Sequence, residues 1–219
     1  MHQRIHTFKP RRGRYSQEQV AAIADSPFLV PLHETVPLAA HFDGMPVILD
    51  IGFGMGDATL VQAQQHPDVG ILAIDVHTPG VGKLLAGLHD TSNVRVVEGD
   101  AMALLHDVLP DASLAGIRVY FPDPWPKARH HKRRIINALH LDVMARRLQP
   151  GGFLHFATDW QDYADAARDT IAAHPSFVLL AADAVLPYAS AQDRPRTKFE
   201  SRGIAAGRTI TDLIAVRTA

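Results

Sequence analysis

The feature that most constrains the fold is an alternation of short apolar runs and helix-like segments, which begins at residue 46. The apolar runs are continuous rather than interrupted by polar residues, and this pattern is typical of strands buried on both faces of a parallel sheet. The runs predicted to be strands are 47–53, 69–76, 93–100, 115–121, 151–158, 177–184 and 210–218. The segments predicted to be helices are 57–66, 80–90, 101–109, 133–149 and 163–174.

This order predicts an α/β protein with a Rossmann-like, doubly wound and mostly parallel seven-stranded sheet. Two strand candidates follow the last helix, so we expect the sheet to end in an antiparallel hairpin, with the last strand antiparallel. Between these two strands we expect residues 185–209 to form a basic loop. The run Pro150, Gly151 and Gly152 is expected to end the helix that precedes it.

The segment before this alternation has a different sequence pattern. Residues 1–45 contain no strong strand run, although 16–26 predicts a short helix, and prolines at 27, 31 and 37 interrupt the chain after it. We therefore expect a basic N-terminal arm with a short helix at 1–45 and a single domain at 46–219.

The composition excludes several classes of site. The chain has no cysteine, which excludes disulfides, thiolate metal ligands and a Cys nucleophile, and which favours a cytoplasmic location. No apolar run approaches the roughly 20 residues that cross a bilayer, so no membrane association is expected. Among the 13 histidines, His130 and His131 have no partner at metal-ligand spacing, and His2 and His6 lie four residues apart in a segment with no other helical signal, so we expect no metal site.

Basic residues are concentrated in three windows, although the net charge of the chain is only −1. The windows 1–15, 118–134 and 194–208 contain 16 of the 22 Lys and Arg residues and 2 of the 23 acidic residues. If the windows converge in space, they form a cationic face suited to a polyanion such as RNA. If they do not, they are three solvated loops.

A glycine-rich turn follows the first predicted strand. It places Gly52, Gly54 and Gly56 between a strand and a helix, where glycine allows a tight turn and a close approach of the backbone to a ligand. The spacing G-x-G-x-G differs from the G-x-G-x-x-G that binds a dinucleotide pyrophosphate.

Acidic residues lie at the ends of the first three predicted strands. Asp50 is suited to an ammonium group, Asp75 to ribose hydroxyls and Asp100 to the border of an adenine. Together they favour S-adenosylmethionine, which has these groups and no phosphate. NAD and a turn without a ligand are the alternatives.

The fourth predicted strand ends in the stretch 120–134, which contains one acid and many cations. Pro122 and Pro124 restrict the backbone on both sides of Asp123 and would fix the direction of its carboxylate. We expect Trp125 to stack on a base. The cations expected to contact phosphates are Lys127, Arg129, Lys132, Arg133 and Arg134. The alternative is a proline-rich turn whose charges are merely solvated.

Several of these stretches resemble the bacterial tRNA (guanine-N7-)-methyltransferases, a family of class I methyltransferases. The resemblance rests on residues 49–57, 76–82, 121–134, 157–160 with Tyr163, 194–203 and the basic run 11–14, and it extends from about residue 4 to residue 217. It implies transfer of a methyl group from S-adenosylmethionine to N7 of a guanine in tRNA, usually position 46 of the variable loop.

The resemblance also implies roles for individual residues. It implies donor-binding roles for Asp50, Gly52, Gly54, Gly56, Asp75, Asp100 and Asp123. Asp123 also matches the position treated as catalytic, and Asp159 is a second candidate for recognition of the guanine. It also implies tRNA-binding roles for Lys127, Asp159, Thr197, Lys198, Phe199 and Glu200.

Three other functions are compatible with parts of the pattern. A small-molecule methyltransferase would have the same glycine turn, and an enzyme that methylates an exocyclic adenine amine would have a similar fourth strand end. A non-catalytic RNA-binding module would share the basic windows but would not bind S-adenosylmethionine. We expect tRNA as the partner and a monomer or homodimer.

Overall fold

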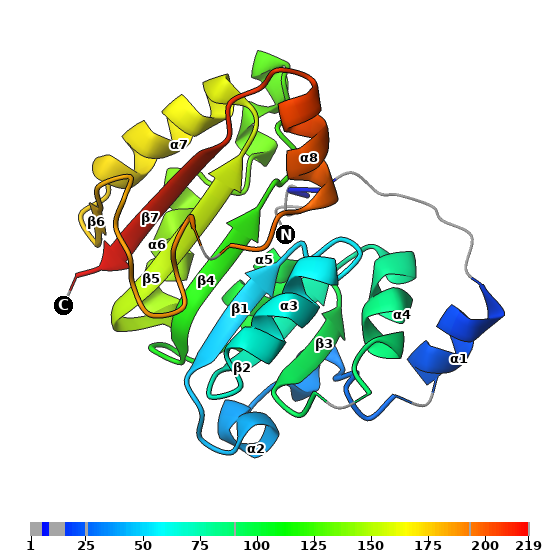
Figure 1. The fold of residues 1–219 in the computed structure, drawn as a ribbon. Coiled ribbons are helices and arrows are strands. Elements are labelled where there is room, and N and C mark those ends of the chain that lie inside the picture. Colours follow the sequence, from blue (N-terminus) through cyan, green and yellow to red (C-terminus); the bar gives the residue numbers. More distant parts are fainter. Residues whose placement is uncertain (1–5, 9–15, 25, 90, 193, 219) are drawn as a thin grey trace.

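The computed structural model describes residues 6–8, 16–24, 26–89, 91–192 and 194–218, and within them it forms one seven-stranded sheet with helices on both faces (Figure 1). The strands are β1 (Val47–Ile51), β2 (Gly70–Asp75), β3 (Val94–Glu98), β4 (Leu114–Tyr120), β5 (Leu148–Thr158), β6 (Phe177–Leu179) and β7 (Thr211–Arg217). Their order is β3-β2-β1-β4-β5-β7-β6. Neighbours from β3 to β5 are parallel, whereas β7 is antiparallel to both β5 and β6. The predicted α/β fold with an antiparallel last strand is confirmed.

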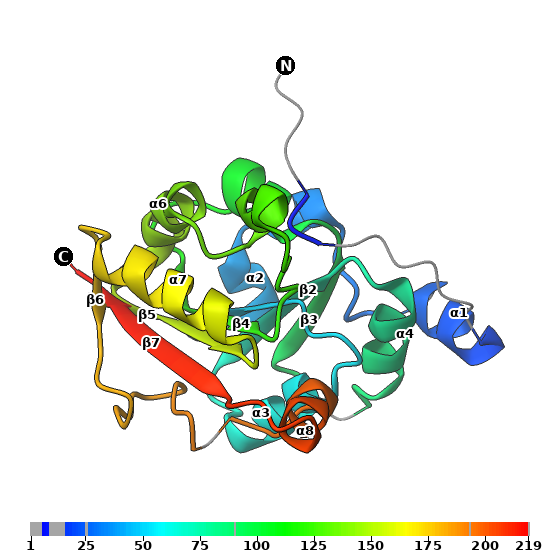
Figure 2. The ribbon, with the colours of Figure 1, turned by 90° about the horizontal axis from the view of Figure 1, so that it is seen from above.

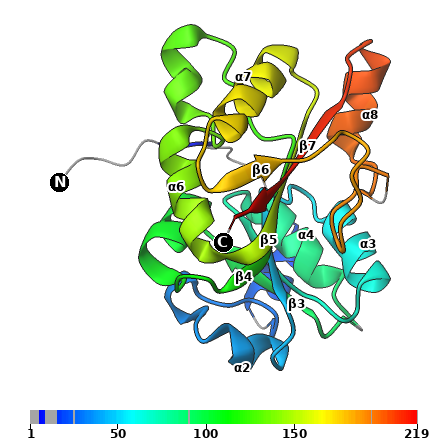
Figure 3. The same ribbon diagram turned by 90° about the vertical axis from the view of Figure 1, so that its left-hand side faces the viewer.

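The apolar runs form central strands because both of their faces are covered. Along β1 the side chains alternate, so that Ile48 joins the hydrophobic cluster of one face and Leu49 joins that of the other. All five residues of β1 are buried. The end-on view in Figure 3 shows the two helical layers on opposite sides of the sheet.

The helices are α1 (Gln17–Ala24), α2 (Leu38–Phe42), α3 (Asp57–Gln65), α4 (Thr78–Ala86), α5 (Ala101–Ala103), α6 (Ala138–Arg147), α7 (Gln161–Ala172) and α8 (Lys198–Ala205). Short helical turns cover Leu32–Glu34, Leu104–Val108 and Ala128–Arg133. Buried residues of α2, α5, α6 and α7 pack on one face, and those of α3 and α4 pack on the other. None of the helices in the described part of the chain is long and apolar enough to span a membrane.

The helix predicted at 133–149 is shorter than expected at both ends. It begins at Ala138 because the Asn137 side chain caps it, accepting a hydrogen bond from the His140 backbone N–H at 3.0 Å. It ends at Arg147, and the chain enters β5 directly, since Leu148 pairs with Leu114 of β4. The prediction that Pro150 to Gly152 end the helix was therefore wrong, because these residues lie inside β5.

The segment between β6 and β7 also differs from the expected loop. The sixth strand is shorter than the predicted run and ends at Leu179, and the basic stretch that follows contains α8. Helix α8 begins with a reciprocal cap, in which Thr197 accepts from the Glu200 N–H at 3.0 Å and Glu200 accepts from the Thr197 N–H at 3.3 Å. The T-x-x-E spacing of this cap was the sequence signal that could have located the helix.

The described part of the N-terminal segment packs on the domain. Helix α1 forms as predicted and contacts α4, where the Gln19 side chain donates to the Pro79 carbonyl at 3.0 Å. Leu38 and Phe42 of α2 belong to the same hydrophobic cluster as Leu49 of β1. The division of the chain at residue 45 stays a prediction, and the basic run 11–14 lies outside the described residues.

We predict that Tyr163→Phe lowers the free energy of unfolding by about 1–3 kcal/mol, because it leaves a buried backbone N–H without an acceptor. The Tyr163 side chain is fully buried, and its hydroxyl accepts a hydrogen bond from the Ile136 N–H at 3.0 Å. Urea unfolding measures the loss. The control is Tyr188→Phe, whose hydroxyl donates to the exposed Asp68, and it should leave the free energy of unfolding nearly unchanged. Equal effects of the two substitutions would contradict the prediction.

Candidate active site

A cavity of about 140 Å³ lies at the carboxyl ends of β1, β2 and β4 and beside the residues that follow β3. Parallel strands end at the same edge of a sheet, and the turns after them meet there. Among the predicted site residues, those that line this cavity are Gly52, Gly54, Asp75, Asp100, Asp123 and Phe199. Hereafter it is called the main pocket.

The glycine turn forms one wall of the main pocket. Gly52 and Gly54 have φ values of +74° and +63°, in the left-handed region that side chains disfavour. A Cβ atom on Gly52 would meet nothing within 4 Å, so the backbone there is open to a ligand. Gly56 is outside the lining and instead packs against Leu84 of α4.

Asp75 ties the end of β2 to the glycine turn. Its carboxylate accepts hydrogen bonds from the Gly54 N–H at 2.7 Å and from the His77 N–H at 2.8 Å. Burial raises the pKa of Asp75 above its ordinary value, although these backbone hydrogen bonds act in the opposite direction. Asp100, at the end of the third strand, caps α5 by accepting from the Met102 N–H at 2.9 Å.

The turn after β4 carries Asp123 into the main pocket. Two side-chain-bearing residues of this turn, Phe121 and Trp125, have φ values of +51° and +46°. Such a backbone is costly and persists only where surrounding contacts enforce it. One of these contacts comes from Arg134, whose Nε donates to the Pro124 carbonyl at 3.0 Å.

Two predictions about this turn were wrong. Trp125 is only 5% exposed, and its indole N–H donates to the Thr7 carbonyl at 2.9 Å, so the ring is a packing element and not an open platform for a base. Arg134 is 3% exposed, pairs with Asp162 and lies over the Tyr163 ring, so it is not available to phosphates. Both side chains instead fix the backbone that presents Asp123.

The main pocket is acidic. Its lining contains Asp75, Asp100 and Asp123, and no Lys or Arg among the described residues. Such a site repels a pyrophosphate, which ordinarily binds to backbone N–H groups at a helix N-terminus or to cations. It favours a ligand with hydroxyl donors and positive charge.

Asp50 faces a different cavity. A second pocket of about 170 Å³ lies between the N-terminal ends of α3 and α8. It shares five lining residues with the main pocket: Gly52, Gly54, Tyr120, Phe121 and Phe199. Asp50 lines this second pocket, is 4% exposed and accepts a hydrogen bond from the Thr59 hydroxyl at 2.7 Å. The expected group of three strand-end acids in one cavity is therefore divided, since Asp75 and Asp100 line only the main pocket.

The predicted tRNA-binding residues are also distributed. Thr197, Lys198 and Phe199 line the second pocket, and Lys198 lies 3.2 Å from Asp57 of α3. The view from above in Figure 2 shows α8 beside α3. Lys127, Asp159 and Glu200 line neither pocket. Asp159 accepts from Arg208 at 2.7 Å, and Glu200 is bound by Arg194.

Described residues of all three windows meet around the main pocket, although the described part of the first window, residues 6–8, contains no Lys or Arg. Thr7 of the first window bonds to Trp125 of the second, and Phe199 of the third lines the same pocket as Asp123. Three arginines of the second and third windows are buried and do not contribute to a cationic surface: Arg118, Arg134 and Arg194. Lys127, Arg129 and Lys132 are exposed.

Sequence reasoning missed two sets of residues near the site. Thr7 and Phe8, from the N-terminal segment, line the main pocket. Arg194, Asp212 and His155 form a buried polar group behind it. No spacing in the sequence connects these residues, because they come from distant segments. No group of three His, Cys, Asp or Glu side chains in the described residues could hold a metal ion.

Comparison with known proteins identifies the family. The model of the family described as "Putative methyltransferase" matches residues 44–213. A tRNA (guanine-N(7)-)-methyltransferase of Streptomyces avermitilis is 46% identical, and the match covers 96% of this chain and 74% of the relative. A protein of the same name from Nitrosomonas europaea is 43% identical, with 100% of this chain and 99% of the relative covered. The chain belongs to this family.

Solved structures place the fold of this family member among methyltransferases. The antibiotic-resistance methyltransferase Kmr has a TM-score of 0.55 at 18% identity, covering 82% of this chain and 91% of that chain. A 16S rRNA (adenine(1408)-N(1))-methyltransferase from Catenulisporales acidiphilia has a TM-score of 0.54 at 15% identity, covering 87% and 92%. At these identities the likeness extends to the fold alone.

The buried Asp50 predicts a specific pH dependence of stability. Burial raises the pKa of Asp50 in the folded protein, although the Thr59 hydrogen bond and the charge of Arg118 oppose this. The stabilisation linked to the raised pKa is fully present below the unfolded value of about 4 and is lost as the pH rises through the folded value. The difference in unfolding free energy between wild type and Asp50→Asn should therefore fall as the pH rises above about 4.

Urea unfolding at a series of pH values tests this, with Asp57→Asn as the control. At Asp57 burial acts to raise the pKa, but hydrogen bonds from Lys83 and Lys198 outweigh it and lower the pKa. The contribution of Asp57 to the free energy of unfolding is therefore constant above about pH 4. The difference in this free energy between wild type and Asp57→Asn should not change with pH in that range. A flat or rising difference for Asp50→Asn would contradict the expectation.

Proposed function

We propose that this protein transfers the methyl group of S-adenosylmethionine to N7 of a guanine in tRNA, and that this guanine is position 46 of the variable loop. Membership of the family supports the reaction, because the relatives carry the name tRNA (guanine-N(7)-)-methyltransferase. The observation that carries the proposal is the single acidic pocket in which the glycine turn, Asp75, Asp100 and Asp123 meet.

The residues of the main pocket fit the methyl donor. Asp75 would accept from the ribose hydroxyls, Asp100 would border the adenine, and the open backbone at Gly52 and Gly54 would lie against the methionine portion. The pocket lining has carboxylates to balance a sulfonium and an ammonium group, and its described residues include no cation for a phosphate. These features favour S-adenosylmethionine over NAD. When bound, the donor would supply a methyl group on a sulfonium, whose carbon a nucleophile can attack as the C–S bond breaks and the neutral thioether leaves.

The chain's own residues then have tasks of alignment and charge placement. Guanine N7 has a lone pair and no proton in neutral RNA, so no residue has to act as a base on it. We assign Asp123 to accept hydrogen bonds from N1–H and N2–H₂ of the guanine. These contacts would select guanine over adenine and would balance the positive charge that develops on the ring.

Asp159 is less suited to this task, because it lies outside both pockets whereas Asp123 lines the main pocket. The exposed cations Lys127, Arg129 and Lys132 would bind phosphates of the tRNA. Because the main pocket lies at the strand ends, the target guanine has to leave its tertiary contacts and enter the cavity.

The test is methyl transfer from labelled S-adenosylmethionine to bulk tRNA, followed by borohydride and aniline cleavage at N7-methylguanosine. We expect cleavage at position 46, and a transcript with adenine at that position should accept no label. Label at an adenine amine would favour an enzyme that methylates exocyclic adenine amines. Label only on small molecules would favour a small-molecule methyltransferase. Calorimetry that detects no S-adenosylmethionine binding would indicate a non-catalytic RNA-binding protein.

We predict that Asp123→Ala lowers turnover by roughly 100-fold or more, since it removes the carboxylate that balances charge on the alkylated guanine. Retention of tRNA on a filter should stay close to wild type, because the phosphate contacts come from other residues. Asp183→Ala, at an exposed position outside both pockets, is the control and should have wild-type turnover. Normal turnover of Asp123→Ala would refute the assignment.

A further inference from the structure

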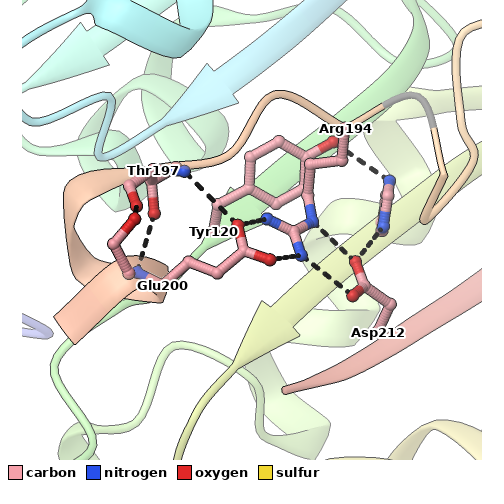
Figure 4. Close-up of polar contacts among 7 residues, drawn as sticks. Tyr120, Arg194, Thr197, Glu200 and Asp212 are labelled. Carbon is pink, nitrogen blue, oxygen red and sulfur yellow. Dashed lines mark hydrogen bonds and ion pairs between the residues drawn. The ribbon is translucent and has the colours of Figure 1, made fainter. Parts of the chain in front are cut away.

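A buried polar network lies behind the strand-four turn and connects it to α8 (Figure 4). Arg194 is at its centre. Its guanidinium donates to both carboxylate oxygens of Glu200, at 2.8 and 3.1 Å, and to both oxygens of Asp212, at 2.8 and 3.1 Å. The Arg194 side chain is 2% exposed, so both ion pairs are shielded from water.

The network continues from Asp212 into the sheet. His155 Nε2 lies 2.8 Å from the Asp212 carboxylate, and His155 Nδ1 lies 3.0 Å from the Tyr120 hydroxyl. Burial lowers the pKa of His155, which favours a neutral ring that donates from Nε2 and accepts at Nδ1. Burial acts to raise the pKa of Asp212, but hydrogen bonds from His155 and Arg194 hold it below its ordinary value.

Arg194 also packs on the residues that lead to Asp123. Its guanidinium carbon lies 5.5 Å from the centre of the Tyr120 ring and 5.2 Å from that of Phe121. Both rings line the main pocket, as does Phe199 of α8, whereas Arg194 does not. One side chain therefore contacts the end of β4, the start of β7 and the first turn of α8.

We infer that Arg194 is a positioning residue, which fixes α8 on the strand-four turn and so sets the place of Phe199 relative to Asp123 where the guanine enters. This inference rests on the proposed function. The guanidinium suits the task because its planar fork binds two carboxylates at once, each through paired hydrogen bonds. A lysine would keep the charge but could not hold both carboxylates in this way.

The first measurement needs neither RNA nor donor. In Arg194→Lys, amide hydrogen exchange of α8 should be about tenfold faster than in wild type, because the charge-assisted bonds that hold the helix are weakened. The control is Arg217→Lys. Arg217 is at the opposite end of β7, where it donates to the Leu148 carbonyl, and its replacement should leave exchange of α8 unchanged. Unaltered exchange of α8 in Arg194→Lys would overturn the inference.

The second measurement separates positioning from a general loss of structure. Arg194→Lys should lower kcat by about 10-fold to 100-fold. The dissociation constant for S-adenosylmethionine, measured by calorimetry, and the KM for tRNA should change less than about threefold, since Arg194 is outside the main pocket. A loss that appears in donor affinity, with kcat unchanged, would indicate a purely structural role.

A double-mutant cycle with Phe199→Ala tests the route of the effect. If Arg194 acts by placing Phe199, the double variant Arg194→Lys, Phe199→Ala should have a kcat within about threefold of that of Phe199→Ala alone. The inference would be overturned if the kcat losses of the two single variants multiplied in the double variant. It would also be overturned if Phe199→Ala had wild-type kcat. Wild-type methylation is measured first, because its absence refutes the proposed function. A normal wild-type rate together with a normal Arg194→Lys variant refutes only the role of Arg194.

Discussion

The parallel pairing of β1 with β2 and β4 is the constraint on which the rest of the structure depends. Ile51 of β1 is level with Ile74 of β2 and with Val119 of β4, so three strands end side by side. Each chain segment must then turn at the same edge, and the residues after the strands have no alternative but to meet there. The main pocket is the space that these turns enclose.

Buried arginines stabilise the turns around this pocket. A guanidinium buried without a partner would cost several kcal/mol, so each of these side chains needs carboxylates or carbonyls around it. Arg134 binds the Pro124 carbonyl and Asp162, and Arg194 binds Glu200 and Asp212. The same partners fix the backbone on which they lie. Several arginines thus stabilise the fold through buried ion pairs, and in the described part of the chain the proposed RNA contacts are confined to the exposed lysines and arginines.

Much of the architecture could be predicted from local pattern. Continuous apolar runs located the central strands, because a strand covered on both faces requires apolar side chains on both. The segment containing α8 could not be found in this way, because it has no apolar run and is anchored instead by Arg194. The burial of Trp125 could not be predicted from sequence either. Whether an aromatic ring after a strand packs in the protein or stacks on a ligand depends on neighbours that are distant in sequence, such as Thr7.

The sequence by itself determined the sheet, the glycine turn and the acids at the strand ends, because these follow from residue types at short spacing. It also carried the resemblance to tRNA (guanine-N7-)-methyltransferases, which the relatives confirm as the family of this chain. Only the tertiary structure decided that Asp50 faces a second pocket while Asp75, Asp100 and Asp123 share the first. It alone decided which arginines are buried, because the partner of a buried charge comes from elsewhere in the chain and is brought to it only by the fold.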